Sequence, residues 1–477
     1  MTAAYDDWPP PPDEPPDDDP WGGYNTEAVA QEVAGDSLND HGQVRLAHRL
    51  AAREQGRLLH VHGLGWHRWD GARWTPDDGG FAKRAVIETL RDEWTKAFGD
   101  KALAREVKAC SNASAVRGIL DIAAALKPFA ATVEDLDADV YLLNVANGTL
   151  DLRTLELRPH DPADRITKVT TAAYRPDARS DLWTGFLERI LPDADVRDYL
   201  QRFLGVALLG RVVEQVFTIA LGTGANGKSV SYEALLHALG DYGHTGESDL
   251  FMAAKSNANS ASPAVAALRG KRFVVTSETE QGHKLATALM KSLTGGDPIT
   301  ARQLYRDPVT FIPSHTVLLV SNHLPMVAAD DPAVWRRMRV VPFDVVIPAQ
   351  EQDGRLGEKL QLEADAILTW AVEGYRQYEV QGLAAPEAVQ AATAEYQKAS
   401  DAIARFIEDR CLVGPHWTVP AGELYEAWVK WSIEDGADPV AKKQFGAEMD
   451  KRGFKDKRTN THRLRTGITL AGDDDEL

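Results

Sequence analysis

The sequence predicts an α/β fold. The apolar run 216–221 has the composition of a buried strand, the stretch 222–229 is rich in glycine, and residues 230–239 have the pattern of a helix. Two further apolar runs, 272–276 and 316–320, end in polar residues. A strand, a glycine-rich loop and a helix in this order are typical of a loop that cradles phosphate.

The glycine-rich loop matches the pattern G-x-x-x-x-G-K-S at every fixed position. Its glycines allow the backbone N–H groups to face an anion, and the N-terminus of the following helix adds partial positive charge. Lys228 would reach the β- and γ-phosphates, and Ser229 would bind Mg²⁺. We therefore expect the chain to bind and hydrolyse ATP through a loop composed of Gly222, Thr223, Gly224, Ala225, Asn226, Gly227, Lys228 and Ser229.

Polar residues follow the other two apolar runs. Glu278 and Glu280 follow the first, where one acid would hold Mg²⁺ through water and the other would polarise the attacking water. Asn322 follows the second, and its amide would either orient that water or only cap the end of the strand. Arg336 and Arg337 precede a further apolar strand and suit a finger that enters a neighbouring subunit's nucleotide site.

The composition is that of a multidomain globular protein that remains in the cytoplasm. The chain has 477 residues and a net charge of −18, but its first 20 residues hold seven acids and its last seven hold four, so the rest carries only −7. No run has membrane-spanning length, and no signal segment is present. The two cysteines lack partners at metal-ligand spacing.

Composition and pattern divide the chain into seven segments. We predict a single helix over 103–126 in the second segment, and a helical pattern broken near Pro192 in the third. The segments are a disordered acidic Pro-rich tail (1–30), an α+β accessory domain (31–180), a helical collar (181–212), the P-loop domain (213–350), a helical segment (351–412), a winged-helix-like domain (413–470) and an acidic tail (471–477).

Two parts of the sequence are candidates for contact with nucleic acid. Residues 299–312 predict a hairpin whose tip carries Tyr305 and Arg306, an aromatic group and a cation suited to a nucleic-acid strand. The C-terminal region has helical stretches at 421–432 and 442–451 and then a hairpin, with bases that include Lys442, Lys443, Lys455 and Arg458. These bases either bind DNA or form a solvated face on a helical cap.

Together these motifs resemble the superfamily 3 helicases of viruses and plasmids, in particular the primase–helicases of the poxvirus and phage type. The resemblance covers about residues 36–350. It includes the loop Gly-Ala-Asn-Gly-Lys-Ser, the stretches Thr276–Glu280, Leu293–Arg302, Ser321–Pro325 and Trp335–Arg337, and the upstream Leu143–Gly148. Only some 35 residues precede the accessory region, and for this reason we do not expect a primase domain in this chain.

The resemblance implies an AAA+-like ATPase core that assembles as a hexamer and moves along single-stranded or forked DNA. Whether a separate primase is a further partner stays open. It implies that Glu278 is a metal ligand together with Ser229. The catalytic candidates are Lys228, Glu278, Glu280, Asn322, Arg337 and Arg336. Translocation polarity and the identity of the finger arginine stay open.

The sequence thus predicts a replicative DNA helicase of a phage, plasmid or integrated element. A second hypothesis is an ATP-switched protein that binds an origin or interferes with replication without processive unwinding. A third is a P-loop ATPase that acts on protein partners. Strand-displacement assays separate the first two, and stimulation of ATP hydrolysis by DNA separates both from the third.

Overall fold

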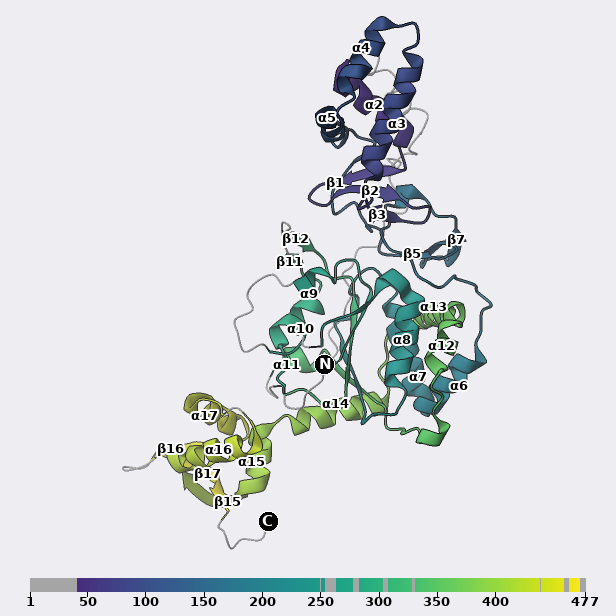
Figure 1. The fold of residues 1–477 in the computed structure, drawn as a ribbon. Coiled ribbons are helices and arrows are strands. Elements are labelled where there is room, and N and C mark those ends of the chain that lie inside the picture. The colour runs from purple at the N-terminus through teal and green to yellow at the C-terminus, as the bar shows by residue number, and fades with distance from the viewer. Residues whose placement is uncertain are drawn as a thin grey trace, which may run out of the picture. The chain divides into compact units, whose positions relative to one another are not determined.

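The computed structural model describes residues 41–248, 250–253, 263–277, 283–302, 308–327, 331–437, 439–458 and 463–471. Contacts divide the chain into two compact units, one ending at Leu136 and the other beginning at Asp137. None of the helices within these ranges is long and apolar enough to cross a membrane. Element labels follow Figure 1.

The first unit combines a small sheet with a cluster of helices. Its strand order is β3-β2-β1-β4, in which β1 and β4 run parallel and the other neighbours are antiparallel. The elements are α2 (Gly42–Glu54), β1 (Leu58–Val61), β2 (Gly65–Trp69), β3 (Trp74–Pro76), α3 (Phe81–Lys96), α4 (Lys101–Cys110), α5 (Ala113–Ala123) and β4 (Ala130–Ala131).

The helix that we predicted over 103–126 is two helices, so that prediction was wrong in its continuity. The Asn112 side chain accepts hydrogen bonds from the backbone N–H groups of Ser114 and Ala115, which caps α5 and ends the helical register of α4. Apolar residues of α2, α3, α4 and α5 then pack into one core that includes Leu46, Val86, Val107 and Ile119.

A five-stranded parallel sheet is the centre of the second unit. Its order is β14-β8-β13-β10-β9, and all four neighbouring pairs are parallel. The carboxyl ends of these strands therefore lie at one edge of the sheet. The strands are β8 (Phe217–Leu221), β9 (Gly243–Thr245), β10 (Phe273–Ser277), β13 (Thr316–Ser321) and β14 (Met338–Pro342). The prediction of an α/β fold is confirmed, and the structure shows in addition that the sheet is parallel.

Both faces of this sheet are covered, as Figure 1 shows. Alternate residues of β8 illustrate this, because Phe217 and Ile219 join one apolar core and Ala220 joins the other. The helices of the core region are α6 (Asp181–Ile190), α7 (Ala194–Val206), α8 (Lys228–Leu239), α9 (Pro263–Ala266), α10 (Thr287–Leu293), α11 (Pro332–Trp335), α12 (Leu356–Gln361), α13 (Ala364–Gln381) and α14 (Glu387–Ala399). The break predicted near Pro192 is confirmed by the end of α6 and the start of α7.

Two smaller sheets accompany the core. One is an antiparallel meander of β5 (Leu142–Val145), β6 (Gly148–Asp151) and β7 (Glu156–Arg158). Its apolar residues belong to the same core as α6 and α7, so residues 137–180 pack with the second unit and not with the accessory domain to which we assigned them. The other is the predicted hairpin, β11 (Ile299–Ala301) with β12 (Val309–Phe311).

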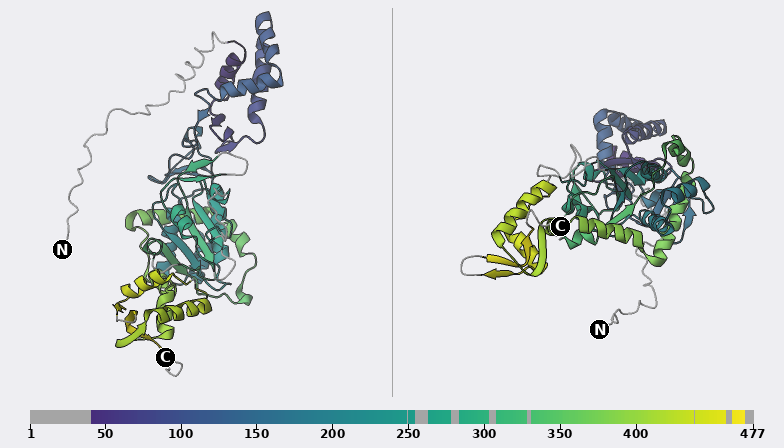
Figure 2. Two further views of the ribbon diagram at one scale, coloured as in Figure 1. Left: turned by 90° about the vertical axis from the view of Figure 1, so that its left-hand side faces the viewer. Right: turned by 90° about the horizontal axis from the view of Figure 1, so that it is seen from below.

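The C-terminal region has a core of its own (Figure 2). The sequence predicted two helices followed by a hairpin, and these elements are present. The structure adds a long strand before them, which pairs with the last strand in the sheet β15-β17-β16. The elements are α15 (Ala402–Arg410), β15 (Cys411–Pro420), α16 (Ala421–Asp435), α17 (Lys442–Lys451), β16 (Asp456–Arg458) and β17 (Arg463–Leu470).

Glycines allow α7 and α13 to approach until their backbones touch. A Cβ atom added at Gly374 would lie 2.0 Å from the carbonyl oxygen of Gln201, and one added at Gly205 would lie 2.1 Å from the backbone nitrogen of Tyr375. Real Cβ atoms essentially never come so close to backbone atoms. This helix pair therefore needs glycine at both positions.

We predict that Gly374→Ala lowers the free energy of unfolding by about 1–3 kcal/mol, because the two helices must separate to admit the methyl group. The matched control is Gly185→Ala in α6, where an added Cβ meets nothing within 4 Å. That change should raise the stability by roughly 0.5–1 kcal/mol through helix propensity. Urea unfolding of both variants measures the difference, and equal effects would contradict the close packing.

Candidate functional site

The candidate site lies at the edge of the sheet where β8, β10 and β13 end. The loop 222–227 connects β8 to α8, whose first residue is Lys228. Gly224, Ala225 and Gly227 have φ angles of 107°, 49° and 79°, so the loop turns sharply through left-handed backbone. A cavity of about 360 Å³ opens there, lined by Gly224, Ala225, Asn226, Gly227, Lys228, Ser229, Val230, Tyr232, Ser277, Val320, Ser321 and Asn322.

Packing against α6 and hydrogen bonds to the segment after β14 fix the shape of the loop. A Cβ atom at Gly227 would lie 2.5 Å from the Ile190 side chain and 3.0 Å from the Phe186 ring, both on α6. Asn226 is buried and its Nδ2 donates to the carbonyl oxygen of Phe343 at 3.1 Å. The backbone N–H of Ile347 donates to the carbonyl of Ala225 at 2.7 Å. The segment after β14 thus holds the loop in place.

Lys228 is the buried charge of the site. Its residue is 5% exposed, and its Nζ donates to the Gly222 carbonyl at 2.5 Å, to the Ser321 carbonyl at 3.2 Å and to Asn322 Oδ1 at 3.3 Å. Burial lowers the pKa of Lys228 to about 8, since none of these acceptors carries a full negative charge. The ammonium group therefore gains from any anion that enters the cavity.

The other residues of this edge divide into three groups. Ser229 is exposed at the start of α8, and Asn322 is exposed just after β13; both line the cavity with Lys228. Ser277, at the end of β10, lines it too and was missed by sequence reasoning, although it directly precedes the predicted acids. Glu278 and Glu280 lie outside the described residues.

The two candidate finger arginines have opposite environments. Arg337 is 7% exposed, and its guanidinium donates to the Ala333 carbonyl at 2.8 Å and to Gln215 Oε1 at 2.7 Å. Arg336 is exposed on the short helix–strand connection. Gln215 is a second residue that sequence reasoning missed, because it lies 122 positions from its partner and nothing in the local sequence links them.

Both arginines lie at the amino-terminal ends of the strands, whereas the glycine-rich loop lies at their carboxyl ends. Strand β14 runs parallel to β8, with Met338 beside Phe217 and Pro342 beside Leu221. Arg336 precedes β14, and the loop follows β8, so the length of a five-residue strand, ~15 Å, separates the two positions. Neither arginine is therefore placed to serve the loop of its own chain.

The residues predicted to contact nucleic acid are exposed wherever the structure describes them. Lys442 and Lys443 begin α17, Lys455 directly precedes the short strand β16, and Arg458 is the last residue of that strand. Other bases of this region are used internally: Arg465 is buried against Asp450, and Arg452 pairs with Asp401 at 2.7 Å and with Glu448 at 2.8 Å. Tyr305 and Arg306 lie outside the described residues.

The fold and the site together define an α/β protein with a glycine-rich loop at the carboxyl edge of a parallel sheet. Two family descriptions match parts of the chain. Residues 45–192 match "D5 N terminal like", and residues 220–337 match a family of unknown function, DUF5906. The second match begins within β8 and ends at Arg337, so it spans the whole loop.

Curated relatives are proteins of large DNA viruses. The chain is 30% identical over 386 residues to "Putative helicase L207/L206" of Acanthamoeba polyphaga mimivirus, which covers 72% of this chain and 40% of that protein. It is 25% identical over 358 residues to "Putative primase C962R" of African swine fever virus (strain Badajoz 1971 Vero-adapted), covering 69% and 37%. It is also 25% identical over 317 residues to "Putative helicase 022R" of Frog virus 3, covering 63% and 31%.

The chain thus spans between three and four tenths of the length of these relatives. Among solved structures, the apo C-terminal region of NrS-1 aligns with a TM-score of 0.40 and 12% identity, covering 64% of this chain and 78% of that one.

We predict that Arg337→Ala lowers the free energy of unfolding by about 1–3 kcal/mol, because it removes a buried side chain together with its hydrogen bonds to the Ala333 carbonyl and to Gln215 Oε1. Arg336→Ala is the matched control, and its effect should stay within about 0.5 kcal/mol because the side chain is exposed. Chemical denaturation of both variants is the measurement. An equal loss in both would show that the two arginines do not differ in structural role.

Proposed function

We propose that this chain is an ATP-dependent DNA helicase of a replication system, and that it acts as a ring of identical subunits. The observation that carries the proposal is the meeting of Lys228, Ser229 and Asn322 around one cavity above a glycine-rich loop. The names of the viral relatives support a role in replication. The P-loop region lies within the part of the chain that a family description matches.

The residues of the site fit a nucleoside triphosphate with its Mg²⁺. The loop turns its backbone through left-handed conformations at the N-terminus of α8, where N–H groups without helical partners attract phosphate. Lys228 would exchange its carbonyl acceptors for phosphate oxygens and so regain a full counter-charge. Ser229 would contribute a hydroxyl ligand to Mg²⁺, which when bound neutralises charge that develops on the phosphates.

Water attack needs groups beyond the loop. Asn322 is exposed at the end of β13 and its Oδ1 already faces Lys228 Nζ, so an amide is available beside the terminal phosphate to orient water. Glu278 and Glu280 follow β10 directly, and β10 ends beside β13 with Ser277 opposite Val320. We assign them the magnesium and water-activating roles on the basis of this position in the sequence.

Arg336 is the better candidate for the finger. Among the described residues its exposed side chain makes no ion pair or hydrogen bond, whereas the guanidinium of Arg337 donates to Gln215 and Ala333. Because both lie at the edge opposite their own loop, a finger from this region would serve the loop of a neighbouring copy. That requirement supports a ring, in which each site is completed by the next subunit.

Contact with DNA would come from two places. The exposed bases Lys442, Lys443, Lys455 and Arg458 present positive charge on the C-terminal region, which would hold duplex DNA. The tip of the β11–β12 hairpin, with Tyr305 and Arg306, would contact the single strand. A separate primase would act as a further partner.

The direct test is strand displacement. We predict that the purified chain separates a forked duplex when ATP and Mg²⁺ are present, and that Lys228→Ala reduces both hydrolysis and displacement to background. Glu233→Ala is the matched control, because Glu233 is exposed on the same helix and does not line the cavity.

Each other outcome of this test has a definite meaning. Hydrolysis that DNA stimulates without displacement would favour the second hypothesis, an ATP-switched DNA-binding protein. Hydrolysis that DNA leaves unchanged would favour action on a protein partner. Wild-type activity in Lys228→Ala would contradict the site itself.

The affinity for ATP should fall above pH 8. The pKa of Lys228 is about 8, so the free ammonium loses its proton as the pH rises past this value, while bound phosphate favours the charged form. We expect the dissociation constant of a fluorescent ATP analogue to rise by up to tenfold per pH unit above pH 8.5. Lys228→Arg should remove the slope, since arginine stays charged. A flat wild-type profile would contradict the role of Lys228.

Mixed assemblies test the neighbouring-subunit finger. Arg336→Ala and Lys228→Ala should each be nearly inactive alone, and co-expression should restore part of the hydrolysis because some interfaces pair an intact loop with an intact arginine. A finger is worth ~10³ or more in turnover, so recovery should stand well above background. The control mixes Arg336→Ala with the double variant that carries both Lys228→Ala and Arg336→Ala. No interface in this mixture has an intact Arg336. Absence of recovery in the first mixture would refute the assignment.

A further inference from the structure

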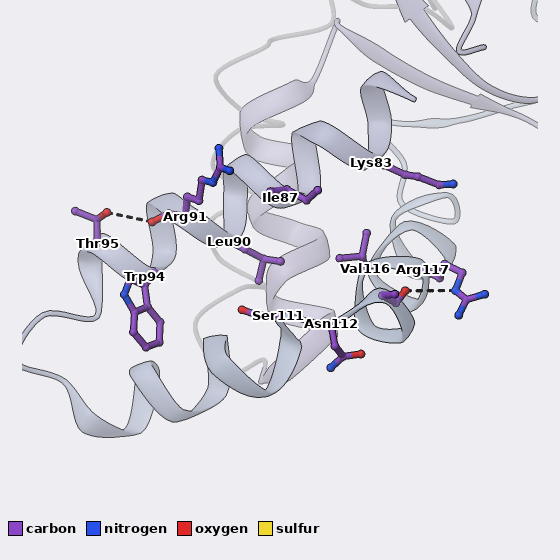
Figure 3. Close-up of a pocket in the computed structure, with 11 residues that line it drawn as sticks. Lys83, Ile87, Leu90, Arg91, Trp94, Thr95, Ser111, Asn112, Val116 and Arg117 are labelled. Carbon is purple, nitrogen blue, oxygen red and sulfur yellow. Dashed lines mark hydrogen bonds between the residues drawn. The ribbon is translucent and has the colours of Figure 1, made fainter. Parts of the chain in front are cut away.

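The first unit contains a groove that the proposed helicase activity does not use. It has a volume of about 990 Å³ and lies between α3, the end of α4 and the start of α5 (Figure 3). Its apolar part includes Trp94 and Ile87, which are 51% and 41% exposed. Leu90 and Val116 extend this surface between the helices.

Three cations surround the apolar part, and no acid lines it. Lys83 and Arg91 are exposed on α3, and Arg117 is exposed on α5. Lys83, Ile87, Arg91 and Trp94 recur at spacings of three and four residues, which places them along one side of α3. Neither Lys83 nor Arg91 has an ion-pair partner among the described residues.

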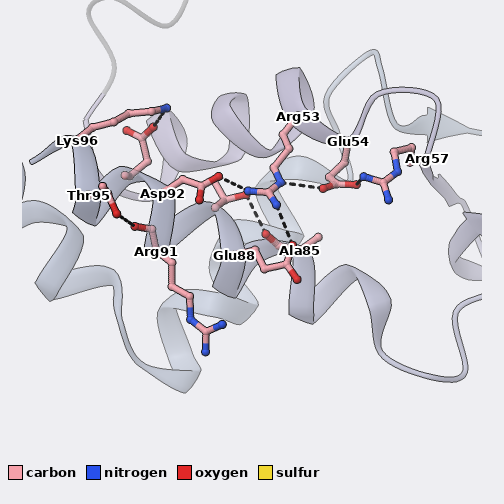
Figure 4. Close-up of polar contacts among 11 residues, drawn as sticks. Arg53, Glu54, Arg57, Ala85, Glu88, Arg91, Asp92, Thr95 and Lys96 are labelled. Carbon is pink, nitrogen blue, oxygen red and sulfur yellow. Dashed lines mark hydrogen bonds and ion pairs between the residues drawn. The ribbon is translucent and has the colours of Figure 1, made fainter.

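The acids of α3 are used on its other side. Figure 4 shows Arg53 of α2 paired with Glu88 and Asp92 of α3, and the Arg53–Glu88 distance is 2.8 Å. Glu93 is buried and pairs with Arg45 at 3.2 Å. The charges of α3 are therefore on different sides of the helix. Its acids pair with arginines of α2, and Lys83 and Arg91 line the groove. A ligand of the groove should be acidic and should carry groups that pack on an indole ring.

The chain itself contains a segment with this chemistry. Residues 1–25 include seven acids, no lysine or arginine, seven prolines, two tryptophans and two tyrosines. Proline-rich peptides are recognised by grooves lined with aromatic residues, and acidic motifs by clusters of cations. The groove offers both features to one peptide.

The connection between this segment and α2 keeps the segment within reach of the groove. The chain enters α2 beside α4 and α5, because the backbone N–H of Gly42 donates to Glu106 of α4 at 2.6 Å and the Gln43 side chain approaches Gly118 of α5, the residue after Arg117. The 16 residues between positions 25 and 42 span at most ~55 Å. A tethered ligand also has an effective concentration on the order of millimolar, so weak contacts are enough to fill the groove.

We propose that residues 1–25 bind the groove between α3, α4 and α5 of the same chain. The prolines and aromatic side chains pack on Trp94 and Ile87, and the carboxylates pair with Lys83, Arg91 and Arg117. The segment thereby covers the cationic surface of the first unit.

Photo-crosslinking in the full-length chain tests this assignment. A benzoylphenylalanine at position 87 should crosslink to the tryptic peptide 1–45, which is the first peptide because Arg45 is the first basic residue. The same group at position 98, where Phe98 is 98% exposed and outside the groove, should not. When nitrogen-15-labelled and unlabelled chains are mixed, each crosslinked product should join two labelled peptides or two unlabelled peptides, because both come from the same chain.

Charge reversal supplies the second arm. Lys83→Glu with Arg91→Glu and Arg117→Glu should lower the crosslink yield at position 87 at least tenfold. The matched control reverses Lys101, Arg105 and Lys108, three exposed bases of α4 that do not line the groove, and should leave the yield unchanged. Circular dichroism of both triple variants checks that the helices are intact.

Four results would overturn the proposal. The first two are the absence of a crosslink from position 87 to peptide 1–45 and equal crosslink yields from positions 87 and 98. The third is a crosslink between a labelled and an unlabelled chain. The fourth is a crosslink from position 87 to an added single-stranded oligonucleotide in place of peptide 1–45. The last result would assign the groove to nucleic acid.

Discussion

The burial of the Lys228 ammonium group is the constraint on which the rest of the site depends. Lys228 is 5% exposed, and the acceptors of its ammonium group within the described residues are dipolar, so the charge is costly and its pKa is lowered to about 8. Three carbonyl or amide oxygens, from Gly222, Ser321 and Asn322, offset part of it. These oxygens come from the ends of two neighbouring parallel strands. The Lys228 ammonium group is held at the carboxyl ends of the strands because β8 and β13 are neighbours in the sheet.

The surrounding structure keeps this arrangement rigid. Gly227 leaves no room for a side chain against α6, and the segment after β14 binds the loop through Asn226 and Ala225. The same strand β14 begins beside Arg336 and Arg337 at the opposite edge. One strand thus connects the loop of the chain's own site with the arginines proposed for a neighbour's site.

Local sequence was sufficient to predict the features that depend on nearby residues. The strand β8, the loop and α8 follow from the apolar run and the glycine pattern, and Pro192 separates α6 from α7. The continuous helix predicted over 103–126 failed because the capping strength of Asn112 outweighed the apolar periodicity on either side. The strand β15 was not foreseen, because Gly414 and Pro415 interrupt it and its register shifts between Val413 and Thr418.

Features that depend on distant partners could not be predicted. Adjacent Arg336 and Arg337 look equivalent in the sequence, and they differ in the fold because Arg337 is buried and bonded to Ala333 and Gln215 whereas Arg336 is exposed. The packing of residues 137–180 with the second unit depends on a core shared with α6 and α7. The groove around Trp94 was also invisible, since it needs α3, α4 and α5 to converge.

A structure of the assembled protein with a non-hydrolysable ATP analogue, Mg²⁺ and forked DNA tests the central claim most directly. The account predicts that the β- and γ-phosphates lie on the backbone N–H groups of residues 224–228, that Lys228 Nζ contacts them, and that Arg336 of an adjacent copy approaches the γ-phosphate. A nucleotide bound elsewhere, or a site closed by arginines of its own chain, would contradict it.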